Sequence, residues 1–566
     1  MIQSPDRRQV LAGAAGLGVA ALATGAGAGV SDGIRAPQIL SGEDIALTIG
    51  HAAVTIDGKP GHAIAVNGTV PGPQIRLKEG QTVRLAVTNA LDEDTSIHWH
   101  GLLVPFQMDG VPGVSFPGIR PGETFVYEFQ IKQAGTYWYH SHSGMQEQEG
   151  VFGSIVIEPA TPDPAPFDRE HVVVLSDFSF AHPHVLMRKL KAQAGYFNRN
   201  KQTVAGLLAG RDQSLKDRLE WSKMRMDPTD ILDVTASAYT YLVNGHGPKD
   251  NWTGLFTPGE RVRLRFINAG GMTVFNVRIP GLPMRVVQAD GLDVAPVEVD
   301  EFQISPAETY DVIVQPTQDL AYSLVAESSD RSGLTRATLA PRLGMSAPVP
   351  PLRARPLATM KDMGMDMSAH AGMGHDMSGM SMAMRDGANA PSVRLTPGVQ
   401  AISPMPADRL GEPPQGLEDA GHRVLLYTDL KALTPNTDPR PPGRTVEIHL
   451  TGNMERFMWA FDGEAFGPLK KPIAFQRDER ARVVLVNDSM MAHPIHLHGH
   501  FFEVDVGHGP LNPRKHTVSV APGGRVAFDL TADAPGDWAF HCHMLMHMHA
   551  GMFNVVTVRP LDGAAA

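Results

Sequence analysis

Hydrophobic and polar residues alternate along three stretches of the chain that lie far apart in the sequence. These stretches are 82–89, 261–268 and 481–487, and each begins after Gly, Pro or Asp turn residues and ends at an asparagine. Alternation with a period of two is typical of β-strands, because successive side chains point to opposite faces. The pattern therefore predicts three copies of one strand-rich unit.

A second motif follows each alternating strand. It is a turn at Pro121, Pro306 or Pro522, followed by a strand, another turn and another strand. Short strands between Gly- and Pro-rich turns predict β-sandwiches, so the expected fold class is all-β. We place the three sandwiches at 40–160, 161–345 and 426–566.

Two stretches interrupt this pattern. Residues 183–225 are rich in Leu, Lys, Arg and Gln, which predicts a helical surface insertion in the second unit. Residues 346–425 form a linker, and its stretch 360–384 holds nine methionines in 25 residues. These methionines follow neither a helical nor a strand period, so we expect a flexible segment that buries no core.

The N-terminus has the features of an export signal. Arg7 and Arg8 precede an apolar stretch that runs from Val10 to about Val30 and contains a small-residue cleavage sequence at 26–28. Paired arginines before a mildly apolar region are typical of the twin-arginine pathway. We therefore expect that residues 1–30 are removed, and that the twin-arginine machinery exports the folded protein to the periplasm.

Composition and charge exclude several classes of protein. The 49 Lys and Arg residues against 60 Asp and Glu give a net charge of −11, which argues against a nucleic-acid binder. Beyond residue 30 no apolar run approaches the roughly 18 residues that span a bilayer, so we expect no stable membrane insertion. The one cysteine, Cys542, excludes an intrachain disulfide. We expect a monomer.

Histidines occupy matching positions in the first and third units. Both units carry histidines nine and eleven residues after the repeat asparagine. Both also carry histidines nineteen and twenty-one residues after the repeat proline. The set is His98, His100, His140 and His142 in the first unit, and His496, His498, His541 and His543 in the third. The second unit has Val277, Ile279, Val325 and Glu327 at these positions. Because residues i and i+2 of a strand share a face, eight imidazoles are expected to converge between units one and three, with unit two as a spacer.

Cys542 lies between two of these histidines and points to the opposite face of their strand. It can therefore bind a separate metal while its neighbours bind the cluster. His493, Cys542 and His547 with a weak axial Met552 form the ligand set of a blue-copper site. The first unit has no cysteine at the corresponding position, so it cannot form this site.

Four motifs in this order resemble those of the multicopper oxidases. They are His98-Trp99-His100-Gly101, His140-Ser141-His142, His493-Pro494-Ile495-His496-Leu497-His498-Gly499 and His541-Cys542-His543-Met544-Leu545-Met546-His547. The resemblance implies three cupredoxin-like Greek-key sandwiches and four copper ions. It also implies one-electron oxidation of a substrate coupled to reduction of O2 to water.

The resemblance also implies a role for each ligand. His98 and His496 would hold the type 2 copper. The two type 3 coppers would be held by His142, His498 and His541, and by His100, His140 and His543. His493, Cys542, His547 and axial Met552 would hold the type 1 copper, with Cys542 as the electron path to His541 and His543. Asp109 matches an acidic proton-relay residue of the family, or it is a turn residue before a glycine. Met548 stands where some relatives carry a second acid.

The methionines predict the substrate, because thioethers select Cu(I). The candidate Cu(I) ligands are Met360, Met363, Met365, Met367, Met373, Met377, Met380, Met382 and Met384 in the segment, and Asp488, Met490 and Met491 beside His493. This segment and the export signal resemble those of the periplasmic copper-resistance type of the family and of bacterial cuprous oxidases. We therefore expect oxidation of Cu(I). A laccase acting on small phenols and a copper-sequestering protein remain as alternatives.

Overall fold

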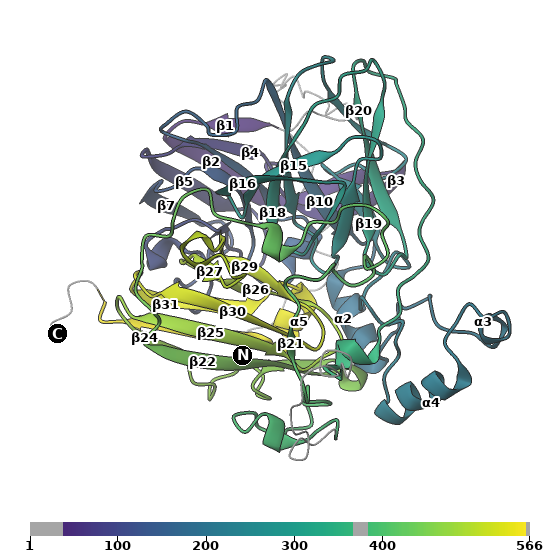
Figure 1. Cartoon of the computed structure of the whole chain (residues 1–566). Coiled ribbons are helices and arrows are strands. Elements are labelled where there is room, and N and C mark those ends of the chain that lie inside the picture. Colours follow the sequence, from purple (N-terminus) through teal and green to yellow (C-terminus); the bar gives the residue numbers. More distant parts are fainter. Residues whose placement is uncertain (1–37, 366–382, 562–566) are drawn as a thin grey trace, which may run out of the picture. The chain divides into compact units, whose positions relative to one another are not determined.

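Three two-layered β-sandwiches follow one another along the chain in the computed structural model, which describes residues 38–365 and 383–561 (Figure 1). The expected signal at residues 1–30 lies outside the described residues. No helix among the described residues is long and apolar enough to cross a membrane.

The first sandwich is formed by a five-stranded and a four-stranded sheet. The five-stranded sheet has the order β1 (Ile39–Ser41), β4 (Gln74–Lys78), β9 (Phe152–Glu158), β8 (Gly135–His140), β6 (His98–His100). The four-stranded sheet has the order β3 (Lys59–Val66), β2 (Asp44–Ile56), β5 (Thr82–Asn89), β7 (Thr124–Gln130). The single-turn helix α1 (Gln146–Glu149) connects β8 to β9.

The second sandwich has a six-stranded and a five-stranded sheet. The order of the first is β11 (Thr240–Val243), β10 (Arg169–Phe178), β13 (Val262–Asn268), β18 (Thr309–Val314), β15 (Met284–Ala289), β16 (Leu292–Val299). The order of the second is β12 (Trp252–Leu255), β20 (Leu334–Ala340), β19 (Tyr322–Ser328), β14 (Phe275–Arg278), β17 (Glu301–Ile304). Between β10 and β11 the stretch 183–225 contains α2 (Pro183–Ala192), α3 (Val204–Leu208) and α4 (Leu215–Met224).

The third sandwich completes the series. One sheet has the order β23 (Met458–Phe461), β22 (Arg444–Asn453), β25 (Arg480–Asn487), β30 (Gly524–Thr531), β27 (Phe502–Val504), β28 (Arg514–Lys515), and β21 (Ala407–Asp408) also pairs with β30. The other has the order β24 (Ile473–Gln476), β32 (Phe553–Arg559), β31 (Gly536–Cys542), β26 (His493–Leu497), β29 (Thr517–Val520). The helix α5 (Leu545–Ala550) follows β31.

The same connections recur in all three sandwiches. The pairs β2–β5, β10–β13 and β22–β25 are parallel, and β6–β8, β14–β19 and β26–β31 are antiparallel. The repeat asparagines Asn89, Asn268 and Asn487 end equivalent strands, are fully buried and donate through Nδ2 to two backbone carbonyls or more. Each asparagine therefore closes the same turn, and the expected set of three all-β sandwiches is confirmed.

The methionine-rich segment departs from one expectation. Met363 is buried, Met360, Met365 and Met384 pack against the core, and β21 joins the third sandwich. The expectation that this stretch buries no core is therefore wrong for its described ends. The flexible thioether fills irregular gaps without a regular period, which is why the sequence pattern missed this packing. Met367, Met373, Met377, Met380 and Met382 lie outside the described residues.

Candidate metal centres

Two pairs of neighbouring strands position the eight matching histidines. In the first sandwich β6 pairs with β8, so that His98 lies opposite His140. In the third, β26 pairs with β31, so that His496 lies opposite His541. Seven of the eight side chains are buried and His142 is partly buried. The second sandwich has the buried apolar side chains Val277, Ile279 and Val325 at three of the equivalent positions.

The eight imidazoles of the two sandwiches converge on one cluster. The ligand atoms of His142, His498 and His541 lie within 4.8 Å of one another, as do those of His98, His496 and His498. His100, His140 and His543 have ring centroids 4.9–5.5 Å apart. The structure therefore brings together every histidine that the register predicts for the cluster.

Six of the eight imidazoles each have a buried ring nitrogen without a hydrogen-bond partner among the described residues. These nitrogens are His98 Nε2, His100 Nδ1, His140 Nε2, His142 Nε2, His496 Nε2 and His543 Nε2, whereas His498 Nε2 and His541 Nε2 lie 3.1 Å from each other. Leaving so many buried nitrogens unpaired is costly unless an ion binds them. Burial also lowers the pKa of His541 to about 4, so that this imidazole is neutral at pH 7, as metal binding requires.

The opposite nitrogens of several rings are held by the protein. His98 Nδ1 lies 2.7 Å from the carbonyl oxygen of Asp109, and His496 Nδ1 lies 2.7 Å from the carbonyl oxygen of His516. His541 Nδ1 lies 3.0 Å from the carbonyl oxygen of Cys542. Such contacts fix the tautomer and aim the free nitrogen at a metal.

Asp109 is fully buried between the first and third sandwiches. Its Oδ2 lies 2.8 Å from His498 Nδ1, while its backbone oxygen contacts His98. Asp109 also precedes Gly110, which has φ +83° and would place an added Cβ 1.8 Å from the Ile97 carbonyl oxygen. Asp109 therefore fits both interpretations from the sequence, because it is a turn residue before a glycine and also contacts the histidine cluster.

A second acid, Glu147, lies at the cluster and is absent from the sequence prediction. Its Oε2 lies 2.6 Å from His140 Nδ1, and its Oε1 lies 3.9 Å from His543 Nδ1 and makes no hydrogen bond. Burial, reinforced by the charge of Asp177, raises the pKa of Glu147 well above its ordinary value. The sequence could not reveal this role, because only the fold distinguishes Glu147 from Glu149 in the same helical turn.

A ninth imidazole, His516, also escaped the register analysis. It is buried, with its ring centroid 4.8 Å from that of His100 and 5.2 Å from that of His496. The hydroxyl of Thr517 lies 3.1 Å from His516 Nδ1 and 3.2 Å from His496 Nδ1. His516 Nε2 is also buried without a partner, and the ligand atoms of His100, His496 and His516 lie within 4.8 Å of one another, so His516 belongs to the cluster.

A separate site surrounds Cys542. The sulfur lies 3.6 Å from His493 Nδ1 and 3.8 Å from His547 Nδ1, and all three side chains are fully buried. Met552 is buried beside them, with backbone hydrogen bonds to Cys542 and His547. Burial raises the pKa of the Cys542 thiol, so a bound metal is needed to hold it as the thiolate.

Residues from other elements orient the two histidines of this site. His493 Nε2 lies 2.8 Å from the Ser489 hydroxyl, and His547 Nε2 lies 2.6 Å from Asp233 Oδ2 of the second sandwich. Trp459 stacks on His547 with a centroid distance of 3.9 Å. Burial lowers the pKa of His547 to about 3 and raises that of Asp233 to about 7. The sequence pattern carried no sign of Asp233 or Trp459.

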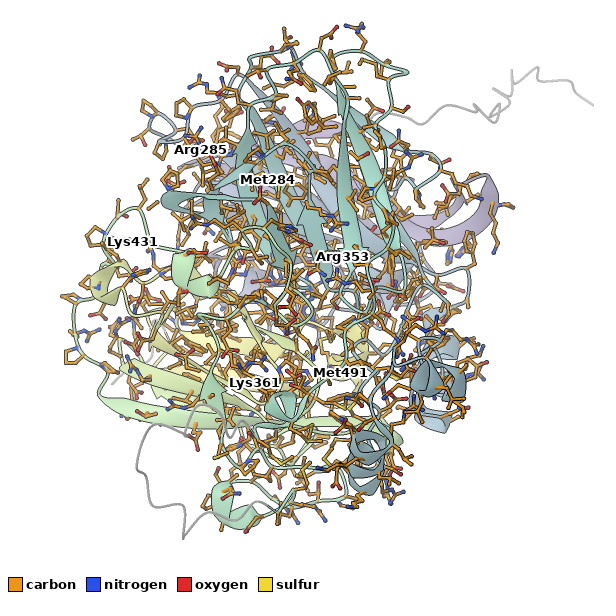
Figure 2. The ribbon with its side chains drawn as sticks, turned by 45° about the vertical axis from the view of Figure 1, so that its right-hand side comes forward. Met284, Arg285, Arg353, Lys361, Lys431 and Met491 are labelled. Atoms are coloured by element: carbon orange, nitrogen blue, oxygen red, sulfur yellow. The ribbon has the colours of Figure 1, made fainter. Side chains whose placement is uncertain are left out.

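The three expected Cu(I)-docking residues near His493 are all buried. Met490 and Met491 are fully buried, and Figure 2 labels Met491. Asp488 Oδ2 lies 2.8 Å from His449 Nδ1, and Asp488 Oδ1 accepts a hydrogen bond from the Ser403 amide at 2.9 Å. The carboxylate is thus already occupied by partners that the sequence did not indicate.

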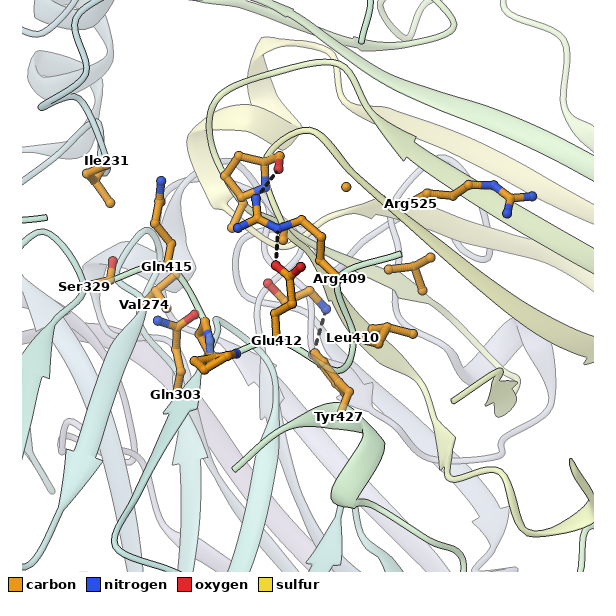
Figure 3. Close-up of a pocket in the computed structure, with 18 of the residues that line it drawn as sticks. Ile231, Val274, Gln303, Ser329, Arg409, Leu410, Glu412, Gln415, Tyr427 and Arg525 are labelled. Atoms are coloured by element: carbon orange, nitrogen blue, oxygen red, sulfur yellow. Dashed lines mark hydrogen bonds and ion pairs between the residues drawn. The ribbon is translucent and has the colours of Figure 1, made fainter. Parts of the chain in front are cut away.

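A small cavity lies between the second and third sandwiches (Figure 3). Its volume is about 70 Å³, and it is lined by Ala492, which precedes His493, and by Met544, which follows His543. Leu232 lines it from the second sandwich. Arg409 closes one side, donating to Glu412 and to the Pro522 carbonyl oxygen.

Comparisons with known proteins agree with this geometry. Family models described as multicopper oxidase match residues 48–162, 201–342 and 439–562. Copper resistance protein A of Escherichia coli is 47% identical, over 92% of this chain and 93% of its own length. The multicopper oxidase MmcO of Mycobacterium tuberculosis is 29% identical, over 92% of this chain and 88% of its own.

Solved structures share the fold. Fet3p, a multicopper oxidase that functions in iron import, matches with a TM-score of 0.66 and 20% identity, over 92% of this chain and 91% of its own. The laccase of Botrytis aclada matches with a TM-score of 0.62 and 21% identity, over 93% and 88%. The domain matches and the relative with 47% identity show that the chain belongs to the multicopper oxidase family.

Proposed function

We propose that this multicopper oxidase oxidises Cu(I) to Cu(II) and reduces O2 to water, in copper tolerance outside the cytoplasm. The oxidase chemistry follows from the family. The substrate rests on one observation in this chain, which is where the ends of the methionine-rich segment are attached. The name of the copper resistance relatives supports the same substrate.

Four copper ions are proposed for the two centres. His98 and His496 hold the type 2 ion, and two sets of three histidines hold the type 3 ions, as the family resemblance implies. His493, Cys542, His547 and Met552 hold the type 1 ion. The unpaired ring nitrogens and the lone buried thiol support this assignment, because they supply soft and imidazole ligands without competing partners.

When bound, the coppers supply one-electron steps that together deliver four electrons to O2. The protein supplies the path for the electrons and the groups that transfer protons. Cys542 is covalently continuous with His541 and His543, so it links the two centres through the chain. Asp109 and Glu147 contact histidines on two sides of the cluster, and we propose that both hold and transfer protons there. Glu147 would then replace the acid that is missing at Met548.

The attachment of the methionine-rich segment carries the choice of Cu(I). At one end Gly364 accepts a hydrogen bond from the Met405 amide, and at the other Met384 accepts one from the Ile402 amide. Both ends therefore meet the strip 402–405, and Ser403 of that strip bonds Asp488, five residues before His493. Both described ends of the segment are thus linked through this strip to Asp488, so we propose that thioethers on the segment deliver Cu(I) to the type 1 site.

The neighbouring cavity also favours a small ion. Ligand pockets for organic molecules are usually about 300–1,000 Å³. The cavity beside Ala492 and Met544 is about 70 Å³. A bulky phenol therefore has no preformed place there, which weighs against the laccase alternative.

The decisive experiment removes the thioethers, in one variant alone and in a second together with the rest of the segment. In one variant Met367, Met373, Met377, Met380 and Met382 become Leu, and in a second a Gly/Ser sequence of equal length replaces residues 366–382. Met360, Met363, Met365 and Met384 stay, because they pack on the core. Both variants should lose Cu(I) oxidation at low Cu(I) by about tenfold, while oxidation of a dimethoxyphenol stays constant or rises.

Steady O2 uptake separates the three functions. Continuous uptake with Cu(I) supports the proposal, uptake with phenol alone supports a laccase, and copper binding without uptake supports sequestration. Unchanged Cu(I) kinetics in the Met-to-Leu variant would contradict the role of the segment. Export is tested by changing Arg7 and Arg8 to Lys, which should keep the protein in the cytoplasm.

A further inference from the structure

The helices α3 and α4 carry an unusual concentration of exposed aliphatic side chains. Val204 and Leu208 on α3 are 71% and 83% exposed, and Leu215 and Leu219 on α4 are 61% and 54% exposed. Figure 1 shows both helices set away from the sheets. Single exposed leucines are ordinary on a protein surface, whereas several within sixteen residues mark an interaction site.

In this stretch, the α3–α4 hairpin (residues 199–225), a few partly buried polar side chains connect the two helices, while four aliphatic side chains are exposed. Arg218 donates to the carbonyl oxygens of Thr203 and Gln213 and pairs with Asp212. Trp221 is buried and anchors α4 to the core. Leu215 and Leu219 are one turn apart, so they share the face opposite Trp221. The internal polar network holds the aliphatic face in water instead of letting it fold inward.

The hairpin is also basic in an acidic protein. Residues 199–225 hold seven Lys and Arg against three Asp and Glu, whereas the whole chain has a net charge of −11. Four exposed cations make no ion pair within the described part of the chain, and these are Arg199, Lys201, Arg211 and Lys216. A partner of this face should therefore combine negative charge with an apolar layer.

We propose that the α3–α4 hairpin docks the protein on the surface of an anionic lipid bilayer. Aliphatic side chains between lysines and arginines match the boundary between acyl chains and acidic headgroups. Protein interfaces instead concentrate aromatic residues and methionine at their centre, and the exposed face of the hairpin offers none. The association is peripheral, since no described helix is long and apolar enough to cross a membrane.

The C-terminal end of the hairpin contacts the segment that precedes Trp459, a neighbour of the proposed type 1 centre. Arg225 at the end of the hairpin pairs with Glu455, and Gln400 donates to the carbonyl oxygens of Met224 and Arg225. Four residues beyond Glu455, Trp459 stacks on His547. The proposal does not depend on the substrate, so it stands or falls apart from Cu(I) oxidation.

Sedimentation with vesicles tests it on the copper-loaded protein. Vesicles of equal parts phosphatidylcholine and phosphatidylglycerol should bind the protein, and pure phosphatidylcholine should not. The double variant Leu215→Ser/Leu219→Ser should lower binding by about tenfold or more. The double variant Lys201→Gln/Lys216→Gln should lower it less, and raising NaCl to about 0.5 M should remove that difference.

Two matched leucines give the control. Leu343 and Leu469 are 74% and 95% exposed but lie outside the hairpin, so Leu343→Ser/Leu469→Ser should bind vesicles like the parent. Equal loss in this control, or no binding of the parent to anionic vesicles, would overturn the proposal. A third result would also overturn the proposal. If the protein bound polyglutamate but no vesicles, and if this binding required Leu215 and Leu219, the partner would be an acidic protein.

Discussion

The second and third sandwiches share a topology but use one strand pair for different chemistry. In the third, β26 and β31 carry His496 and His541 at the metal cluster. In the second, the equivalent β14 and β19 carry Val277 and Val325 in an apolar core. The buried asparagine that closes the neighbouring turn is the same in both. The scaffold therefore folds without metal ligands, and the ligands are local replacements on it.

Glu327 of the second sandwich illustrates this difference between the two sandwiches. Its offset of twenty-one residues from the repeat proline equals that of His543, and it is fully buried. Its carboxylate accepts hydrogen bonds from Arg331 and from Arg353, which lies at the start of the linker. The sequence position of a proposed metal ligand in one sandwich thus anchors the linker in another. Changes at equivalent positions should accordingly affect copper in one case and stability in the other.

The largest effect is expected for Cys542→Ser. Cys542 is the one thiol of the chain, so the thiolate-to-copper absorption and oxidase turnover should both disappear. Metal analysis should show a loss of about one copper per chain, because the nitrogens of the cluster are untouched. A variant that stayed blue would contradict the assignment of the type 1 site.

Glu147→Gln should have the next largest effect. If Glu147 supplies protons to the cluster, steady O2 uptake should fall by about 10²-fold, while anaerobic reduction of the type 1 site stays fast. Glu149→Gln is the matched control, because Glu149 lies in the same helical turn but contacts His182 instead. Equal rates for the two variants would assign Glu147 a structural role only.

Glu327→Ala tests the other side of the comparison. Removing this carboxylate leaves Arg331 buried without its ion-pair partner, which should cost about 3 kcal/mol of stability. Calorimetry should show a lower thermal midpoint, and the copper content should match the parent. The exposed Glu298→Ala serves as control. A loss of copper with an unchanged midpoint would mean that the second sandwich is more than a spacer.

The convergence of the proposed copper ligands could be predicted because it depends on local rules. The positions of His98, His100, His496 and His498 follow from alternation along a strand and from a fixed offset from the repeat asparagine. They do not depend on how the rest of the chain packs. Cys542 follows from the same alternation. The period of a strand involves only residues close together in the sequence, so it can be recognised without knowing the fold.

Contacts that arise only from tertiary packing could not be predicted in this way. Asp233 reaches His547 from 314 positions away in the chain, and Asp488 is bound by His449 and Ser403. These contacts depend on how sandwiches and linker pack, and no periodic pattern records that packing. Met363 was missed for the related reason that a thioether packs without a period.

The smallest effect is expected from the pair of His449 and Asp488. Burial opposes a charged His449, but the hydrogen bond and charge of Asp488 outweigh it and raise the pKa of His449 above 6.5. Folding therefore favours the protonated imidazole. The pair's contribution to stability should be complete below about pH 6.5 and should disappear as the pH rises through the raised pKa.

Thermal midpoints of the parent and of His449→Gln measure this contribution. The difference between them should be largest near pH 6 and should shrink by about pH 8.5. His171→Gln is the control, because burial lowers the pKa of His171 and its ring contacts a carbonyl oxygen, not a carboxylate. A difference that stayed constant with pH would mean that His449 is neutral in the folded protein. Asp488 would then keep its negative charge uncompensated beside Met490 and Met491, and direct docking of Cu(I) at these residues would again be the better interpretation.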